Sequence, residues 1–361
     1  MLEQKDTPSG LLNTPPVQRA IPLDSPLEWK QALFGIRHSF FHTWEHCYAM
    51  FLTTGDPTFL YCAETPEARV VCPFVERRFG DYVDIATPYG FSGFAGNGAL
   101  PDLAGAWHRF AAERGYISGF ISLHPLFADV DRKKPPFAYE LKTLYILNLE
   151  NSIPDLFRNC SKTLRQELNK WQRGVFISTD REELTAFALK NFQEFFHNRK
   201  ATSVYDLNPM TFEFLMGLEN VVVLGVGPRT GLEAVILAGI TPYAAEAIFS
   251  ITTPGARGHG AGLVWKLTEN LHKLQIPYLN LGGGQVPHDS LEFFKSRFGA
   301  EQFPLHVMKE TYEPHAYSKL CRCAGVDPED RSGYFPRYRL SEFISAFGSE
   351  VARGTPREGC R

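Results

Sequence analysis

Apolar and polar positions alternate along the chain with two different periods. Runs with an apolar residue at every second position, rich in β-branched and aromatic side chains, are typical of strands, whereas apolar residues three and four positions apart are typical of helices. In the first half these patterns predict a helix over 40–52, strands over 58–62, 70–79 and 82–86, a helix over 103–115, and strands over 116–123 and 141–149. The mixture predicts an α/β chain.

A second series of elements begins at Ser152, which precedes a proline and an acidic residue as a helix N-cap often does. Phe157, Leu164 and Trp171 then share one face of a single predicted helix that ends at Gly174. A short strand, two helices, three strands over 221–226, 232–240 and 243–251, and an alternation of helix, strand, helix and strand follow. The first half has a shorter version of this order, which predicts two related units in tandem.

Composition limits the classes of protein to which the chain can belong. Hydrophobic residues make up 44% of the 361 residues and charged residues 21%, which is ordinary for a globular protein long enough to hold two domains. The net charge of -3 excludes a basic field over the whole molecule and leaves only a local patch for binding RNA. Residues 1–20 and 346–361 are polar, and we expect a disordered leader and a disordered tail.

The seven cysteines have no spacing typical of a disulfide framework or a zinc site, which predicts reduced thiols. No apolar run is long enough to cross a bilayer, and the amino terminus lacks the apolar core of a signal peptide. We therefore expect a cytoplasmic protein without a membrane span.

The segment His42-Thr-Trp-Glu45-His46 matches a zinc-protease pattern in which two histidines bind the metal and the glutamate acts as a base. The pattern is short, and no second motif marks a further acidic ligand. Trp44 and Met50 are typical of a helix that packs against a core. We therefore expect no metal site.

Two glycine-rich segments lie between residues 257 and 284. Arg257-Gly-His-Gly260-Ala-Gly262 opens a helix, where backbone N–H groups and the helix dipole favour an anion, although it is equally open to interpretation as a plain helix cap. Gly282-Gly283-Gly284 follows a short strand, where it either lines a site or forms only a tight turn that needs positive φ.

These residues resemble two known families. The element order and the Arg257–Gly262 turn resemble the GNAT acyltransferase fold, in which a Gln/Arg-x-x-Gly-x-Gly/Ala turn holds the pyrophosphate of an acyl-CoA. The more specific resemblance is to the FemAB family, which carries two GNAT-like units in tandem. Segments Ser161–Lys170, Tyr278–Gly284, Phe294–Gly299 and Phe335–Arg339 are similar to that family's basic helix, glycine turn, "Phe-Lys-x-x-Phe-Gly" signature and closing segment.

This resemblance implies an α/β (α+β) fold of two tandem GNAT-like domains with mixed sheets, one over 21–150 completed by about 312–345 and one over 151–311. Family members form amide bonds, and the best known move an amino acid from aminoacyl-tRNA to an amine of a peptidoglycan precursor, while relatives serve peptide-antibiotic pathways. The chain lacks the helical arm of some members, so it is similar to the compact, FemX-like kind.

The function implied is an aminoacyltransferase whose donor is aminoacyl-tRNA and whose acceptor is an amine on a small molecule or peptide. The alternatives are an acyl-CoA-dependent N-acyltransferase and a non-catalytic ligand-binding protein. The resemblance implies no cofactor besides the donor substrate, and the sequence does not determine the oligomeric state.

The resemblance also implies roles for individual residues. Lys295 lies near the reacting ester, where an ammonium stabilises the oxyanion; otherwise it is a solvated lysine on a surface helix, although its phenylalanine neighbours are against this. The guanidinium fork of Arg165, with Lys162 beside it, is suited to binding phosphates. The alternative is that both residues lie on a solvated helix face. The remaining predicted substrate-binding residues are Tyr243, Gly282, Gly283, Gly284 and Phe294, and the predicted donor-phosphate residues are Arg257, Gly260 and Gly262.

Overall fold

The computed structural model of the chain describes residues 15–128, 138–171, 175–198, 207–256, 258–284 and 289–340. The expected disordered tail and most of the expected disordered leader lie outside these residues. The rest of the leader is structured, because residues 17–20 belong to the first strand, β1 (Val17–Pro22). This strand pairs along its whole length with β2 (Thr58–Glu64), and such pairing uses backbone groups that even a polar segment possesses.

The first half of the chain closely follows its predicted element order. The strands predicted over 58–62, 70–79 and 82–86 are confirmed as β2, β3 and β4. The elements of this half that follow β1, apart from β2, are in chain order α1 (Pro26–Leu33), η1 (Phe40–His42), α2 (Trp44–Thr54), β3 (Arg69–Phe79), β4 (Tyr82–Ala86), β5 (Ala95–Gly96), α3 (Leu103–Glu113), β6 (Ser118–Leu123) and β7 (Ala138–Asn148).

The second half repeats this order with additional helices. Its elements are α4 (Ile153–Asn159), α5 (Lys162–Trp171), β8 (Phe176–Ser178), α6 (Arg181–Asn198), α7 (Pro209–Gly217), β9 (Val221–Gly227), β10 (Ala234–Ile240), β11 (Ala245–Thr252), α8 (His259–Lys273), β12 (Tyr278–Asn280), α9 (Ser290–Ser296), β13 (Glu301–Thr311), α10 (Pro314–Cys323) and η3 (Arg337–Arg339). None of the helices in the described ranges combines the length and the apolar character needed to cross a membrane.

The strands form one mixed sheet in the order β1-β2-β3-β4-β6-β13-β7-β12-β11-β10-β9-β8, with β5 paired to β3. Two neighbouring pairs are parallel, β4 with β6 and β11 with β12, and a crossover helix joins the strands of each pair, α3 in the first half and α8 in the second. Each parallel pairing spans two residue pairs only. Beyond Glu246↔Asn280, β11 continues to Thr252 while the chain after β12 turns away.

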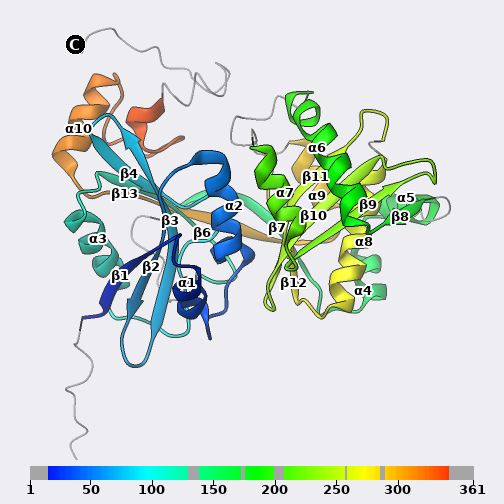
Figure 1. The fold of residues 1–361 in the computed structure, drawn as a ribbon, viewed down its shortest axis with the longest axis horizontal. Helices are drawn as coiled ribbons and strands as arrows, with labels where there is room; N and C mark the ends of the chain where they lie inside the picture. The colour runs from blue at the N-terminus through cyan, green and yellow to red at the C-terminus, as the bar shows by residue number, and fades with distance from the viewer. Residues whose placement is uncertain are drawn as a thin grey trace, which may run out of the picture.

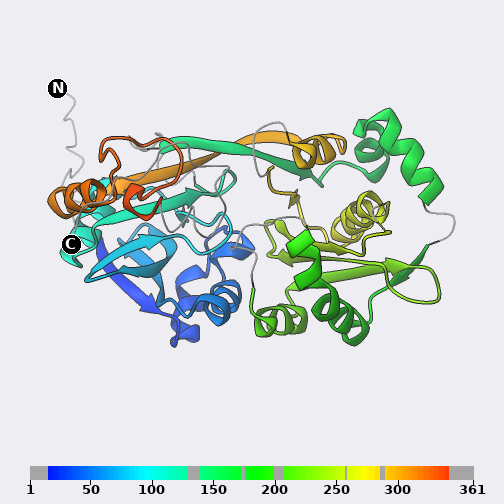
Figure 2. The same ribbon diagram turned by 90° about the horizontal axis from the view of Figure 1, so that it is seen from above.

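Two long strands exchange places between the halves. β7 follows β6 in the sequence but pairs with β12 of the second half, whereas β13 follows β12 and pairs with β6 of the first half. β7 and β13 also pair with each other from Glu301↔Ile146 to Met308↔Ala138. They lie side by side and extend across both lobes of the molecule (Figures 1 and 2). The domain limits predicted at residues 150 and 311 remain predictions. The strands before and after these residues belong to one continuous sheet.

Helices of the two halves also pack directly on each other. Thr211 of α7 contacts α2 through a 2.7 Å hydrogen bond between its Oγ1 and Oγ1 of Thr53 and a 2.9 Å bond to the carbonyl of Ala49. Gly239 of β10 leaves room for the buried Phe40, because a Cβ at Gly239 would lie 2.1 Å from that ring. The two lobes therefore share a close-packed contact.

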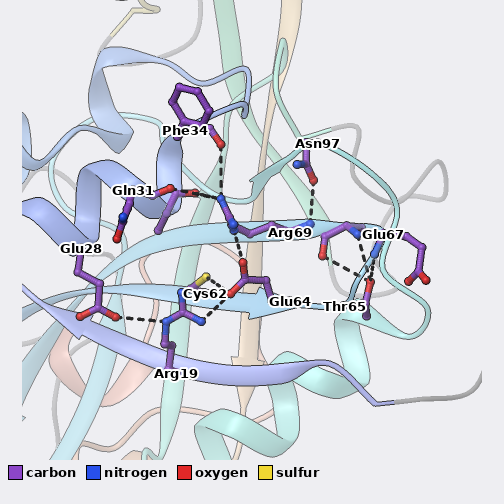
Figure 3. A network of polar contacts seen from close by, with 12 residues as sticks. Arg19, Glu28, Gln31, Phe34, Cys62, Glu64, Thr65, Glu67, Arg69 and Asn97 are labelled. Carbon is purple, nitrogen blue, oxygen red and sulfur yellow. Dashed lines mark hydrogen bonds and ion pairs between the residues drawn. The ribbon is translucent and has the colours of Figure 1, made fainter.

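An ion-pair network anchors α1 to the edge of the first half (Figure 3). Glu64 of β2 accepts from Arg19 of β1 at 2.6 Å and from Arg69 of β3 at 2.5 Å. Nη1 of Arg69 also lies 3.3 and 3.4 Å from the carbonyl oxygens of Gln31 and Phe34 at the end of α1. Cations favour the carbonyl end of a helix, so Arg69 stabilises this end of α1.

The single helix predicted from Ser152 to Gly174 is instead two helices, and that prediction was wrong. Ser152 caps α4 as expected, but Cys160 is extended, with φ of -60° and ψ of 148°. The hydroxyl of Ser161 then accepts from the backbone N–H of Leu164 at 3.2 Å and begins α5. A serine that binds the backbone locally competes with a continuous helix, which explains the break.

Candidate active site at the glycine turn

The three glycines after β12 form a turn in which each position excludes a side chain. Gly282 has φ of 72°, in the left-handed region that favours glycine. A Cβ at Gly283 would lie 2.4 Å from the carbonyl oxygen of Thr143 in β7, and a Cβ at Gly284 would lie 2.5 Å from Cγ of Glu292 in α9. The tight-turn interpretation of the glycine run therefore holds, because the turn needs positive φ and admits two neighbouring elements closely. That the glycines also line a site remains a prediction.

Helix α9 brings Lys295 to this turn. Asp289 caps the helix, its Oδ1 accepting from the backbone N–H groups of Leu291 at 3.0 Å and Glu292 at 2.8 Å. The Lys295 ammonium donates to the carbonyl of Gly283 at 2.7 Å, and a Cβ at Gly282 would lie 3.3 Å from the same nitrogen. The predicted residues Lys295, Gly282, Gly283 and Gly284 are thus brought together.

The environment of Lys295 favours the neutral amine more than water does. Burial and, to a smaller extent, the charge of Lys142 lower its pKa to about 7, against the opposing effect of the carboxylates of Asp289 and Glu292. At neutral pH both the amine and the ammonium are therefore populated. A side chain with both forms available can accept a proton in one step and stabilise negative charge in the next.

Lys142 is a member of this site that the sequence analysis did not single out. Its Nζ lies 3.4 Å from the carbonyl oxygen of Gly284 and 5.3 Å from the centre of the Phe91 ring. Burial lowers the pKa of Lys142 as well. A lysine in a polar stretch of strand resembles any solvent-facing lysine, so no sequence signal distinguishes it.

A chain of buried hydrogen bonds holds the turn from behind. The backbone N–H of Leu126 donates to Nδ1 of His124 at 3.2 Å, which leaves Nε2 of His124 to donate to Glu246 at 2.8 Å. Glu246 accepts from Asn280 at 2.9 Å, and the amide oxygen of Asn280 accepts from the N–H of Gly282 at 2.8 Å. This relay joins the segment directly after β6 in the first half to β11, β12 and the glycine turn of the second.

The predicted phosphate ligands on α5 lie in a different setting. The guanidinium of Arg165 donates to the carbonyls of Arg158 at 2.7 Å and Cys160 at 2.5 Å, so it stabilises the end of α4. Lys162 is exposed in the first turn of α5. Phe294 packs edge-on against Phe298, with 5.4 Å between the ring centres, at the edge of the hydrophobic core of the second half.

Tyr243 is separated from the glycine turn by the length of a strand pair. It precedes β11, whereas Gly282 follows β12, and because these strands are parallel the two residues lie beyond opposite ends of the pair. Tyr243 instead lies 5.8 Å from the ring of His38 and lines an open cavity of about 510 Å³ with Trp44 and Glu45. The structure does not bring Tyr243 and Lys295 together.

The first turn of α8 contains two glycines with different surroundings. A Cβ at Gly262 would lie 2.1 Å from the Trp171 ring, so packing against α5 requires this glycine. Outside its own helix, a Cβ at Gly260 would come no closer than 4.0 Å to any described residue, the nearest atom being Cζ of Phe294. Arg257, the third predicted donor-phosphate residue, lies outside the described residues.

The histidines of the zinc-protease pattern each have a backbone partner. Nδ1 of His42 accepts from the N–H of Ser39 at 3.2 Å, and a ring nitrogen of His46 lies 2.6 Å from the carbonyl oxygen of Tyr89. Glu45 forms an ion pair with Lys30 at 2.8 Å. The residues that the structure describes contain no group of three or more His, Cys, Asp or Glu side chains that could hold a metal ion.

Comparison with known proteins identifies the fold. No protein-family model and no curated protein matches the chain. The structure is similar to that of FemX, with a TM-score of 0.62 at 9% identity over 84% of this chain and 99% of that one. It is also similar to the C-terminal domain of a putative lysylphosphatidylglycerol synthetase from Agrobacterium fabrum, with a TM-score of 0.55 at 13% identity over 92% and 98% of the two chains.

L-PGS from Bacillus licheniformis is similar to the same degree, with a TM-score of 0.55 at 11% identity over 90% of this chain and 97% of that one. The chain therefore has the tandem GNAT-like fold of FemX. The predicted α/β architecture of two tandem GNAT-like units is confirmed, and their strands join in one large mixed sheet.

Proposed function

We propose that the chain is an aminoacyltransferase that moves an aminoacyl group from aminoacyl-tRNA to an amine on a small molecule or peptide. The observation that carries this proposal is the Lys295 amine, held 2.7 Å from the carbonyl of Gly283 by the helix that follows the glycine turn. The FemX fold and the Phe294-Lys295 signature support the same reaction. A cytoplasmic location, where charged tRNA is available, belongs to this proposal.

Lys295 can serve both halves of such a transfer. Its neutral amine accepts a proton from the acceptor ammonium, and the freed acceptor nitrogen attacks the carbonyl carbon of the donor ester. The resulting Lys295 ammonium lies beside the oxyanion of the tetrahedral intermediate and stabilises it. When the C–O bond of the ester breaks, the departing ribose oxygen takes the proton from Lys295. The nitrogen of the new C–N bond still carries one extra hydrogen and a positive charge, and it releases that proton to water as the tetrahedral intermediate collapses. The lysine returns to the neutral form, and the products are an amide, an uncharged ribose hydroxyl and one proton in solution.

The buried relay behind the turn fits a site that has to stay in one geometry. Because Asn280 holds the N–H of Gly282 and Glu246 holds Asn280, the carbonyl that positions Lys295 belongs to a fixed backbone. Sites whose supporting groups are fully hydrogen-bonded lose little energy to reorganisation during the reaction.

A second candidate function is transfer of an acyl group from acyl-CoA. The observation in its favour is the open space at Gly260, in the first turn of α8 and next to Phe294, because helix N-termini bind phosphate groups well. In this case the same lysine and glycine turn serve a thioester in place of a tRNA ester.

The decisive experiment offers the purified chain two labelled donors in parallel, a pool of aminoacyl-tRNAs and a set of acyl-CoAs, each with amine-bearing extract. Mass spectrometry of the products then distinguishes the candidates. We expect amide products that carry an amino acid from the tRNA pool, and we expect Lys295→Ala to lower the rate of their formation strongly while Lys319→Ala, on α10, does not. Label transfer from CoA alone would contradict the proposal, and tight ligand binding without transfer would favour the non-catalytic alternative.

A further inference from the structure

Strand β7 contributes a second amine to the glycine turn. The turn lies along this strand, because the N–H of Tyr145 donates to the carbonyl of Gly282 at 3.1 Å and the N–H of Leu281 donates to the carbonyl of Tyr145 at 2.9 Å. Three residues before Tyr145, Lys142 directs its Nζ to the carbonyl of Gly284 at 3.4 Å. The neighbouring carbonyl of Gly283 is the one that Lys295 contacts.

The two amines therefore bind successive carbonyls of one turn from two different elements. Lys142 is partly buried, whereas Leu141 before it is 44% exposed, so the lysine is turned toward the turn and not toward solvent. On its other side the amine approaches the ring of Phe91 from the first half, 5.3 Å from the ring centre. A cation held over an aromatic ring in a partly buried position is more strongly fixed than one in water.

Five titratable groups interact at the turn, namely the two amines, the carboxylates of Asp289 and Glu292, and the hydroxyl of Tyr145. The pKa of Lys295 is lowered by burial first and by the charge of Lys142 second, while Asp289 and Glu292 on α9 act in the opposite direction. The same two carboxylates favour the charged form of Lys142 and raise the pKa of Tyr145 beyond the effect of burial. Two like charges on neighbouring carbonyls disfavour each other, so the ammonium of Lys142 favours the neutral amine of Lys295.

We propose that Lys142 is a positioning residue of the transfer site, whose ammonium keeps the neighbouring Lys295 amine ready to accept a proton. This inference rests on the proposed function for its purpose, but the effect of one amine on the other does not depend on any substrate. Because β7 belongs to the first half in sequence and to the second in space, the exchanged strand is what brings Lys142 to the site.

The test compares Lys142→Met, which keeps an unbranched apolar stem and removes the charge, with Lys142→Arg, which keeps the charge. Lys266→Met, on α8, is the matched control for loss of a partly buried lysine. Trace labelling of each lysine with acetic anhydride from pH 5 to 11, followed by peptide mass spectrometry, gives the titration midpoint of Lys295. We expect Lys142→Met to raise that midpoint by about one pH unit, the usual order for losing a nearby like charge.

Lys142→Arg and Lys266→Met should leave the midpoint of Lys295 where it is in the parent protein. An unchanged midpoint in Lys142→Met, with a parent-like circular dichroism spectrum, would overturn the proposal, as would equal shifts in all three variants. The pH profile of transfer should move upward with the midpoint in Lys142→Met only. A shifted midpoint without any transfer from aminoacyl-tRNA would instead refute the proposed function and leave the amine pair standing.

Discussion

Lys295 combines a half-buried position with an ionisable amine. A half-buried lysine without a close ion pair loses part of its hydration, and no ion pair to Lys295 within 4 Å is found among the described residues. Its partner is a backbone carbonyl, which accepts a hydrogen bond from either form of the amine. Such a position is unfavourable for folding and useful for proton transfer, which is the usual trade between stability and activity.

Replacing Lys295 with methionine should therefore have opposite effects on turnover and stability. Turnover should fall by about 10²–10³, the ordinary effect of removing one group that stabilises an oxyanion. In the parent protein, transfer should rise as the pH passes upward through about 7, because the proton-accepting form of Lys295 then predominates. Steady-state rates from pH 5 to 9 check both statements, and a flat profile would contradict the role of Lys295 as a base.

The sign of the stability change follows from the lowered pKa. The folded-state pKa of Lys295 is about 7 and its ordinary value is 10.5, so the unfolded chain binds the proton more tightly. The unfavourable contribution is fully present below pH about 7 and disappears as the pH rises toward 10.5. Lys295→Met should thus raise the melting temperature most at pH 6, whereas Lys319→Met, an exposed lysine on α10, should change it little at any pH.

At the scale of elements, the start of α8 contains two glycines that serve different purposes. Gly262 exists because Trp171 of α5 occupies the space of its Cβ, and the indole of Trp171 also donates to Nδ1 of His259 at 2.9 Å. Gly260, two residues earlier, has no described neighbour this close. Packing against Trp171 therefore explains why position 262 is glycine. Packing does not explain why position 260 is glycine, because the described residues around it leave room for a side chain.

Alanine at each position separates these causes. Gly262→Ala should lower the free energy of unfolding by about 1–3 kcal/mol, as overpacking does. Gly260→Ala should raise it by roughly 0.5–1 kcal/mol, because alanine is the better helix former. Urea denaturation measures both values.

Donor binding gives the second readout for the same pair. If a donor phosphate approaches the backbone at Gly260, then Gly260→Ala weakens binding of the donor although it stabilises the fold. Unchanged donor affinity in that variant would remove the turn from the donor site. Gly262→Ala is the control that changes stability without adding a methyl group on the open side.

For the whole molecule, the exchange of β7 and β13 makes each half depend on the other. β6 pairs with β13, which lies more than a hundred residues later in the chain, and β12 pairs with β7. The packed contact of α2 with α7 and the relay from His124 to Glu246 cross the same boundary. The halves should therefore unfold together.

Fragments cut at residue 150 provide the test. Residues 1–150 alone would leave β6 without β13, and residues 151–361 alone would leave β12 without β7, so each fragment exposes an unpaired strand edge. We expect neither fragment to show a cooperative thermal transition by circular dichroism, and we expect the intact chain to show a single one. A cooperative transition in either separate fragment would contradict this dependence.

A feature of this molecule can be predicted from the sequence when the residues that determine it lie close together along the chain. The strands β2, β3 and β4 follow from alternation within a few residues, and Ser152 caps α4 through its own side chain. The break at Cys160 was missed because the apolar period continues across it. Lys295 was found because a signature surrounds it, whereas Lys142 has no local signature at all.

The sequence by itself determined the periods of the helices and strands, the glycine turn and the tandem order, since each depends on sterics and hydrogen bonds between near neighbours in the chain. Only the tertiary structure decided that β13 completes the sheet of the first half and that Lys142 meets Lys295 at one turn. Strand pairing uses backbone groups that all residues share, so the choice of partner is set by packing of the whole sheet. The glycine turn was visible in the sequence, but the second amine beside it was not.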